Sequence, residues 1–344
     1  MEGRSDLSKV VQRVSANLEL FGLPAGTIPK NADTLQEAFQ VDLGVVLEAL
    51  REITGEDRPR LPDERYKAKE VSAADAENFV DELLGLDLPA KLLAKVPLLE
   101  HESLNAVTNI VSTLLRHDLP PTMKKHATQY VCEHRHFVEL VMGGMAEEHL
   151  AYHKGAILRS CSRRREVTKV FLANGAADDL LKVILKADAA LAYDAFGGLR
   201  HLLLECVAES AEWLEVNFEN FFKTYHRIVM TTDYVLKRMA LSLLSSLLGQ
   251  HRFMKVSYRY ATTEAYLKLV MNLLRDSSNA VRVEAFHVFK VFVGADTPAN
   301  IRQILMRNRV KLIELLESMR AVSKRESKSA EHMAVVIGRL RQLQ

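Results

Sequence analysis

The clearest hydrophobic pattern lies between residues 266 and 293, where two helical stripes flank a short polar break. The first stripe has helical spacing and offers one apolar face to a neighbouring element. The break, Asp276 to Asn279, consists of small polar residues that suit a tight turn and the cap of a following helix. The second stripe is apolar nearly all round. A helix of that kind must be covered on both sides, as the inner helix of a stacked helical pair is.

The same alternation of amphipathic helices and short breaks runs along the chain, and no convincing period-two strand pattern interrupts it. Candidate inner helices begin near Leu104, His149, Ala190, Tyr234 and Ala280, at intervals of roughly 41 to 46 residues. Armadillo and HEAT repeats have a period of about 40–47 residues. The pattern therefore predicts an all-α chain with the architecture of an armadillo/HEAT-like helical-repeat solenoid.

We predict one solenoid over residues 1–344. It would start with divergent N-terminal helices over 1–89, broken by glycine and proline at 22–26 and by an exposed loop at 54–65. Helical repeats would follow over 90–322. After a polar break at 323–329, a final helix would occupy 330–344.

The composition fits a soluble protein with a substantial core, since 48% of the residues are hydrophobic and 26% are charged. The formal net charge of +2 creates no global field that would collect nucleic acid. No run approaches the about 18 apolar residues of a membrane span, and no apolar leader stands at the N-terminus. The three cysteines are far apart and form no CxxC pair. We therefore predict a cytoplasmic protein with no membrane span and no nucleic-acid partner.

Catalytic motifs are missing from the sequence, which has no P-loop, GxGxxG, HExxH or GxSxG pattern. The run Cys132-Glu133-His134-Arg135-His136 contains zinc-ligating residue types. On a helix, however, residues two apart point away from one another, and no second cluster completes four ligands. We predict no enzyme activity, no cofactor and no metal site.

The densest basic cluster comprises Arg159, Arg163, Arg164 and Arg165. It is interpreted either as a solvated helix end, where arginines complement the helix dipole, or as a groove for an acidic peptide or a phosphate. No aromatic residues interleave with it, which argues against stacking of nucleic-acid bases.

Two residues one turn apart, Tyr234 and Arg238, stand at the expected groove-lining edge of the predicted helix at 234–248. Tyrosine and arginine are enriched at the hot spots of protein interfaces. The preceding stretch at 213–229 is rich in aromatic residues and is predicted as one amphipathic helix that packs in the core.

At these residues the sequence resembles the calcium-binding protein 39 (morula protein 25) family of armadillo-like kinase scaffolds. The resemblance rests on MNLLRDSSNAVRVEAFHVFKVFV at 271–293 and KLIELL at 311–316. It is supported by GAILRSC at 155–161, DAF at 194–196, WLEVNFENFFKTY at 213–225 and YVLKRMALSLL at 234–244. The match extends weakly to about residue 90.

The resemblance implies a right-handed solenoid without catalytic activity whose concave face holds a kinase or pseudokinase in its active arrangement. A pocket near the C-terminal end would receive a peptide of the Trp-Glu-Phe type. Implied partners are a STRAD-like pseudokinase with liver kinase B, and sterile-20-class kinases, in a hetero-complex with one copy of this chain. The residues implied to bind partners are Tyr234 and Arg238 on the concave face, Met271 in the peptide pocket, and Arg307 as a basic contact.

Two positions depart from the family pattern. Ser242 stands where the family has lysine, and Ala189 stands where it has an aromatic contact. These departures keep a second function open: a cytoskeletal or ciliary adaptor that retains the fold without kinase activation.

Overall fold

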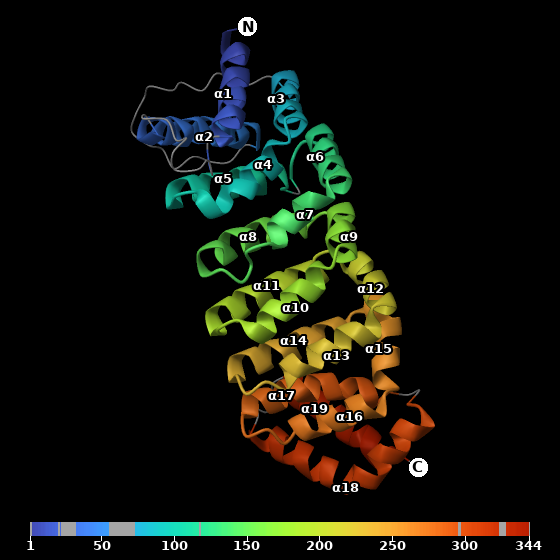
Figure 1. Cartoon of the computed structure of the whole chain (residues 1–344). Helices are drawn as coiled ribbons and strands as arrows, with labels where there is room; N and C mark the ends of the chain where they lie inside the picture. The colour runs from blue at the N-terminus through green and yellow to red at the C-terminus, as the bar shows by residue number, and fades with distance from the viewer. Residues whose placement is uncertain are drawn as a thin grey trace. The chain divides into compact units, whose positions relative to one another are not determined.

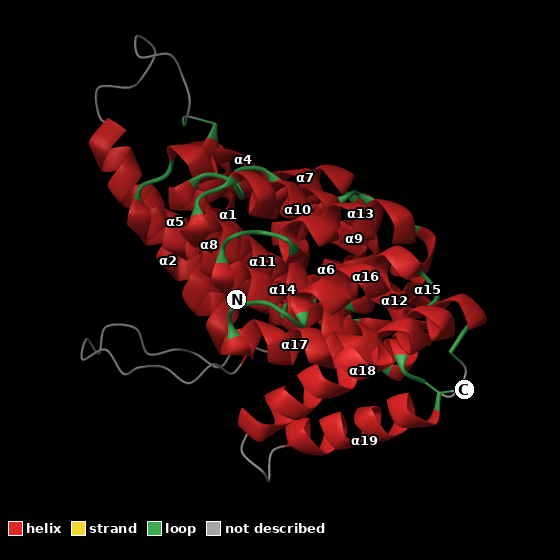
Figure 2. Cartoon of the chain, turned by 90° about the horizontal axis from the view of Figure 1, so that it is seen from below, coloured by secondary structure: helices red, strands yellow, loops and turns green. Residues whose placement is uncertain are grey.

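The computed structural model describes residues 2–19, 21, 32–54, 73–116, 118–294, 297–322 and 328–343. This described part consists of helices and connecting loops without any strand (Figure 2), which confirms the all-α prediction. The chain divides into two compact units, Met1–Cys206 (unit 1) and Val207–Gln344 (unit 2), and each is described by itself. The prediction of one continuous solenoid over 1–344 stays a prediction.

Unit 1 contains eleven α-helices and one 3-10 helix within its described residues. They are α1 (Glu2–Leu18), α2 (Ala32–Thr54), α3 (Ala73–Gly85), α4 (Leu88–Lys95), η1 (Val96–Leu98), α5 (His101–Leu114), α6 (Pro121–Glu133), α7 (Arg135–Met142), α8 (Glu148–Cys161), α9 (Arg165–Ala173), α10 (Ala176–Lys186) and α11 (Ala189–Leu204).

The helices of unit 1 stack as triplets in three layers (Figure 1). The layers are α3–α6–α9, α4–α7–α10 and α5–α8–α11, and within each layer a helix packs on the equivalent helix of the next triplet. Helix α2 continues the third layer by packing on α5. Because each triplet buries its apolar surface on its neighbours, the arrangement is that of an armadillo-type repeat. The triplets begin with α3, which precedes residue 90.

Unit 2 contains eight α-helices and two 3-10 helices in its described residues. They are α12 (Val207–Val216), α13 (Phe218–Val229), α14 (Tyr234–Gly249), η2 (His251–Phe253), α15 (Met254–Ala261), α16 (Glu264–Leu273), α17 (Asn279–Phe289), η3 (Lys290–Phe292), α18 (Ala299–Val322) and α19 (Lys328–Gln342). Helix α12 packs on α15, α14 on α17, and α18 on both α16 and α19.

The inner helices start where the hydrophobic pattern predicts them. Helices α5, α8, α11, α14 and α17 all begin within three residues of the predicted starts. The polar break before α17 acts as predicted, because the Ser278 hydroxyl caps the helix by accepting a hydrogen bond from the Val281 N–H. Phe286 and Val288, which lie about 200° apart around α17, are both fully buried. The all-round apolar character of this helix is thus explained by cover on both sides.

An aromatic cluster forms the core of unit 2. The rings of Phe218, Phe222 and His226 on α13 contact Tyr266 on α16, and Phe222 also contacts Tyr260 on α15. Two polar contacts fix the cluster: the hydroxyl of Tyr225 donates to the Ala240 carbonyl at 2.7 Å, and His226 Nε2 lies 3.0 Å from the Tyr260 hydroxyl. These bonds satisfy polar atoms that burial would otherwise leave unpaired.

One predicted helix is broken in the structure, and the cysteine–histidine run is divided between two helices. The predicted helix at 213–229 consists of α12 and α13, with Asn217 between them. The Asn217 side chain donates to the Trp213 carbonyl at 2.9 Å, so it satisfies the end of α12 instead of continuing the helix. In the cysteine–histidine run, α6 ends at Glu133 and α7 starts at Arg135, with His134 between them.

Several predictions fall wholly or partly on residues outside the described ranges. These are the glycine–proline break at 22–26, most of the exposed loop at 54–65, and residues 323–327 of the polar break before the last helix. Helix α19 starts at Lys328, two residues before the predicted position.

Candidate functional site

The first turn of α14 exposes the tyrosine and the arginine that the sequence singles out. Asp233 caps this helix, since its side chain accepts a hydrogen bond from the Leu236 N–H at 2.8 Å. Tyr234 is 46% exposed, and Arg238, one turn further on, is exposed as well. Because Leu236 and Ala240 point into the core, the helix presents Tyr234 and Arg238 together on its free face.

An ion pair holds α14 against the start of α17. Lys237 Nζ lies 3.1 Å from Asp276 Oδ2, and both side chains are largely buried. Asp276 also accepts a hydrogen bond from the Ser278 N–H at 2.9 Å. Burial by itself would raise the pKa of Asp276, but the bonds from Ser278 and Lys237 outweigh it and lower that pKa below its ordinary value.

Helix α17 contributes an acidic residue to the same surface. Burial raises the pKa of the Glu284 carboxyl, and the positive charge of Arg238 partly opposes this shift. Arg238 and Glu284 therefore influence each other across the α14–α17 contact. The sequence shows Glu284 as one of few polar residues on an apolar helix, but it does not show which helix Glu284 faces.

Met271, which the resemblance implies for the peptide pocket, lies on α16. Arg307, which it implies as a basic contact, lies on α18, and these two helices pack on each other. Met271 is half-buried and Arg307 is exposed. Arg307 has two exposed apolar neighbours on α18, Met306 at 41% and Val310 at 64%. This part of α18 thus offers a cation beside apolar side chains.

The two departures from the family pattern lie in different units. Ser242 is half-buried on α14, one turn beyond Arg238, and its carbonyl accepts a hydrogen bond from the Ser246 hydroxyl. Ala189 is the exposed first residue of α11 in unit 1. Both are small residues that offer a partner little contact area.

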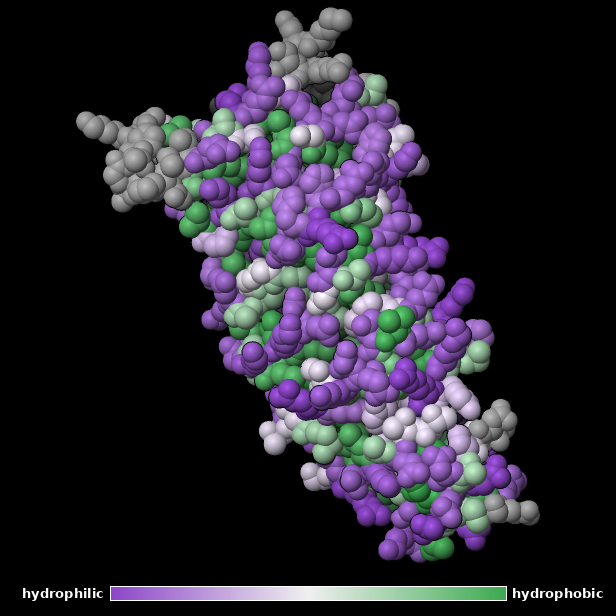
Figure 3. Space-filling model, turned by 45° about the vertical axis from the view of Figure 1, so that its right-hand side comes forward, coloured by the Kyte–Doolittle hydropathy of each residue, from purple (hydrophilic) through white to green (hydrophobic). Residues whose placement is uncertain are grey.

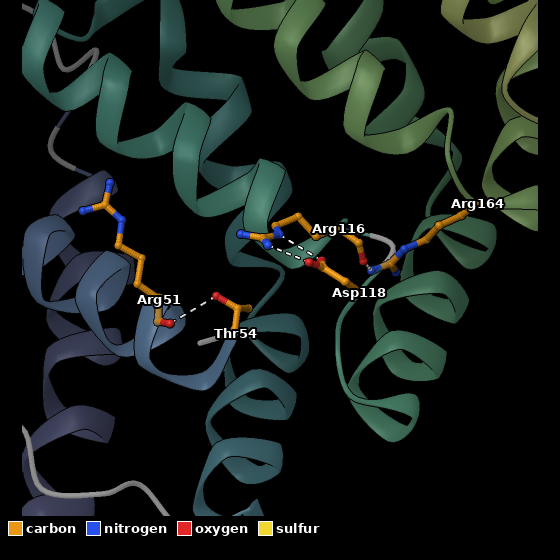
Figure 4. Close-up of polar contacts among 5 residues, drawn as sticks. All are labelled: Arg51, Thr54, Arg116, Asp118 and Arg164. Atoms are coloured by element: carbon orange, nitrogen blue, oxygen red, sulfur yellow. Dashed lines mark hydrogen bonds and ion pairs between the residues drawn. The ribbon is translucent and has the colours of Figure 1, made fainter. Parts of the chain in front are cut away.

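One member of the basic cluster is a structural residue, which corrects the interpretation of the whole cluster as a solvated helix end. Arg164 is only 2% exposed. Its guanidinium donates to the carbonyls of Leu114, Arg116 and Lys124 and to the Thr128 hydroxyl. Figure 4 shows its contact with Arg116. Burial lowers its pKa to about 10, so it stays charged at neutral pH. Arg164 thereby joins the end of α5, the following loop and α6 to the start of α9.

The loop that Arg164 contacts contains an ion pair of its own, between Arg116 and Asp118. Arg116 and Asp118 form two hydrogen bonds side by side, Nε–Oδ1 at 2.9 Å and Nη2–Oδ2 at 2.6 Å (Figure 4). This bidentate geometry is the strong form of an arginine–carboxylate pair. It fixes the Arg116 carbonyl as an acceptor for Arg164.

Two other arginines of the cluster, Arg159 and Arg163, line a groove of about 420 Å³ in unit 1. The groove lies on α5, α8 and α11 and is lined by Asn105, Thr108, Asn109, Ser112, Tyr152, His153, Ala156, Arg159, Ser160, Arg163 and His201. We call it the polar groove. Its residues recur at helical spacing on α5 and on α8, a signal present in the sequence. Only the fold shows that the two stripes face one cavity.

The described residues contain no group of three or more His, Cys, Asp or Glu that could hold a metal ion. The three cysteines form no disulfide with one another; Cys132 is exposed and the other two are buried. None of the described helices is both long and apolar enough to cross a membrane. On the face shown in Figure 3, hydrophilic residues interrupt the hydrophobic ones.

Comparison with a solved structure supports the fold. A crystal structure of a Kap121p mutant superimposes with a TM-score of 0.53 at 10% identity, covering 90% of this chain and 28% of that one. At this identity the likeness concerns the helical-repeat fold alone.

Sequence comparisons identify relatives over most of the chain. Calcium-binding protein 39-like of Homo sapiens is 31% identical over 277 residues, which cover 80% of this chain and 81% of the human protein. The Mo25-like protein of Schizosaccharomyces pombe is 31% identical over 258 residues, which cover 75% of this chain and 78% of the yeast protein. The sequence model of the Mo25-like family matches residues 4–344, including the N-terminal part that the motifs left divergent. The chain therefore belongs to the Mo25-like family.

Proposed function

We propose that this chain is a non-catalytic cytoplasmic scaffold that binds a kinase or pseudokinase through the free face of α14 and a Trp-Glu-Phe-type peptide at α16 and α18. Membership of the Mo25-like family over residues 4–344 is the observation that carries the proposal. The exposure of Tyr234 and Arg238 on one face supports it, because these residue types dominate interface hot spots.

The chemistry of α16 and α18 suits a peptide with one acidic and two aromatic side chains. Arg307 supplies a positive charge for the glutamate. Met271, Met306 and Val310 supply partly or fully exposed apolar surface for the aromatic rings, and methionine adapts well to such contacts.

A scaffold of this kind activates a kinase only if it binds the active conformation more tightly than the inactive one. The surface of α14 is suited to that role because it is held in place. The Lys237–Asp276 pair and the Tyr225–Ala240 bond fix α14 against α17 and α13 respectively. A partner whose regulatory helix matches this surface would gain binding energy without deforming it.

Binding of a fluorescein-labelled peptide ending in Trp-Glu-Phe, followed by fluorescence polarisation, tests the peptide site. We expect saturable binding that Met271→Ala weakens at least tenfold, about 1.4 kcal/mol. Met254→Ala is the matched control, because Met254 is exposed on α15 of the same unit. Equal affinity of all three proteins, or no binding by the folded wild type, would contradict the peptide site.

Kinase activation is tested separately, with a sterile-20-class kinase and a STRAD-like pseudokinase as partners. We expect the wild type to raise kinase activity and Arg238→Ala to lose both binding and activation, with the exposed Arg252→Ala as control. Ser242 and Ala189 favour the alternative, a cytoskeletal or ciliary adaptor. Association with a cytoskeletal fraction that survives Arg238→Ala, together with absent activation, would favour that adaptor.

A further inference from the structure

The polar groove of unit 1 is not used by the proposed function, whose partner-binding residues all lie in unit 2. Its walls come from α5 and α8, with His201 contributed by α11, and Arg163 follows directly after α8. None of the lining residues is acidic. A cavity with cations and no carboxylate on its walls is complementary to an anion.

The two arginines in the groove are unpaired within the part of the chain that the structure describes. Neither Arg159 nor Arg163 forms a hydrogen bond or an ion pair among the described residues, whereas Arg164 beside them donates to three main-chain carbonyls and to the Thr128 hydroxyl. Arg159 is half-buried, and its guanidinium lies over Gly155, where an added Cβ would come within 3.3 Å of Nη1. Partial burial of an unpaired charge costs free energy that an anionic ligand would offset.

Neutral hydrogen-bond donors surround the two charges. The Ser112 hydroxyl is buried without a partner among the described residues. The side chains of Asn105 and Asn109 make no hydrogen bond there either, and Tyr152 is 64% exposed. An anion with several acceptor oxygens would satisfy these groups together.

His153 adds a fixed but uncharged group to the wall. Its Nδ1 lies 2.9 Å from the Thr108 hydroxyl, which sets the orientation of the ring. Burial lowers the pKa of His153, and the nearby His101 and His149 lower it further. At neutral pH His153 therefore adds a hydrogen-bonding group to the wall and no positive charge to that of Arg159 and Arg163.

We infer that the polar groove binds a phosphorylated serine or threonine side chain within an extended segment of a protein partner. A phosphate carries close to two negative charges and three acceptor oxygens, which matches two guanidinium groups ringed by amide and hydroxyl donors. The groove crosses three stacked helices at roughly 8–10 Å each, so it suits about six extended residues. The inference does not rest on the proposed function.

A bead-bound peptide pool with a fixed central phosphothreonine and randomised flanks tests the inference with the full chain. The same pool without phosphate, and a pool with two aspartates in place of phosphothreonine, serve as comparison arms. We expect the wild type to be retained at least tenfold more on the phosphorylated pool than on either of the others at 150 mM salt, a concentration at which weak surface electrostatics are screened.

On the phosphorylated pool, the double variant Arg159→Gln/Arg163→Gln should be retained at least tenfold less than the wild type. The matched control is Arg165→Gln/Lys169→Gln, which removes the same charge from exposed positions on α9 outside the groove. It should bind within twofold of the wild type. Circular dichroism melting of both variants verifies that they are folded.

Three outcomes would overturn the inference. Equal loss in the two double variants would mean non-specific attraction to positive charge. Equal retention on the aspartate pool would mean an acidic-peptide site without selectivity for phosphate. Full competition by 1 mM inorganic phosphate would mean that the groove binds the free ion and needs no peptide segment. Arg238→Ala should leave retention unchanged, which separates this test from the proposed kinase surface.

Discussion

The two units hold their helices together by different chemistry. In unit 1, the buried Arg164 ties α5, α6 and the start of α9 through main-chain carbonyls. In unit 2, aromatic rings join the helices instead: Phe222 on α13 contacts the rings of Phe218, Tyr260 and Tyr266. Hydrogen bonds from a charged donor depend on directed acceptors, whereas ring packing depends on shape and area.

The free faces of the two units differ as well. On α14 and α17 the charges act on one another, since Lys237 pairs with Asp276 and Arg238 influences Glu284. In the polar groove, Arg159 and Arg163 face no acidic lining residue. A surface whose charges are already paired gains little from a strongly charged ligand and favours contacts of shape and area. A surface with unpaired cations selects for an anion. The comparison therefore predicts two kinds of ligand on one chain.

The largest expected effect is on the aromatic core of unit 2. Phe222→Ala should destabilise this unit by about 4 kcal/mol, because a fully buried ring leaves a cavity among rings that cannot all collapse into it. Trp213 is the only tryptophan and its ring centroid lies 5.9 Å from that of Phe221, so its fluorescence during urea unfolding reports on unit 2. Tyr258→Ala, at a 63% exposed position, should change the free energy of unfolding by less than about 0.5 kcal/mol.

The next effect concerns the buried arginine of unit 1. Arg164→Met keeps much of the side-chain volume but removes the donors to three carbonyls, so we expect a loss of about 3 kcal/mol. Hydrogen exchange followed by mass spectrometry should show about 100-fold lower protection in peptides from α5 and α6. Arg163→Met, at an exposed neighbouring position, should leave protection unchanged. If both variants lower protection equally, the hydrogen bonds of Arg164 do not hold α5 and α6 against α9.

Acid should weaken unit 2 through two half-buried histidines. Burial lowers the pKa of His226 to about 4, and burial with the charges of Lys290 and His332 does the same for His287. Unfolded histidine has a pKa of about 6.5, so between pH 6.5 and 4 the unfolded chain binds protons that the folded chain does not. The stabilisation that unit 2 gains from keeping these two histidines neutral is therefore fully present above about pH 6.5, and it is lost as the pH falls toward 4.

At pH 5 each histidine should cost about 2 kcal/mol of stability relative to pH 7. His226→Gln should reduce the difference in unfolding free energy between pH 7 and pH 5, measured by Trp213 fluorescence, by about that amount. The exposed His251→Gln should not alter the difference. An unchanged pH dependence in His226→Gln would contradict this expectation, because it would mean that His226 binds its proton in the folded state at the same pH as in the unfolded state.

The smallest effect is expected for the ion pair that fixes α14. A double-mutant cycle of Lys237→Met and Asp276→Asn should give a coupling free energy of about 1 kcal/mol, since both side chains are largely shielded from water. The exposed pair Lys268–Glu264 provides the control and should give a coupling near zero. A coupling near zero for Lys237–Asp276 would show that unit 2 gains nothing from pairing its charges.

Much of the fold could be predicted from the sequence. The starts of α14 and α17 were predictable because local signals coincide there: a capping side chain, Asp233 or Ser278, precedes an apolar stripe of helical period. The break at Asn217 was missed because the apolar period continues across it. A single asparagine ends the helix through a hydrogen bond that the pattern of hydrophobic residues does not contain.

By itself, the sequence determined the all-α class, the spacing of the inner helices and the family, since all three depend on residues close together in the chain. Only the tertiary structure decided the roles of individual charges. Arg163 and Arg164 are neighbours of the same type, yet one lines a groove and the other is buried against carbonyls from α5 and α6. Arg164 lies 50 residues from its acceptor Leu114. The cost of burying a charge depends on partners brought together by folding, and local patterns carry no information about them.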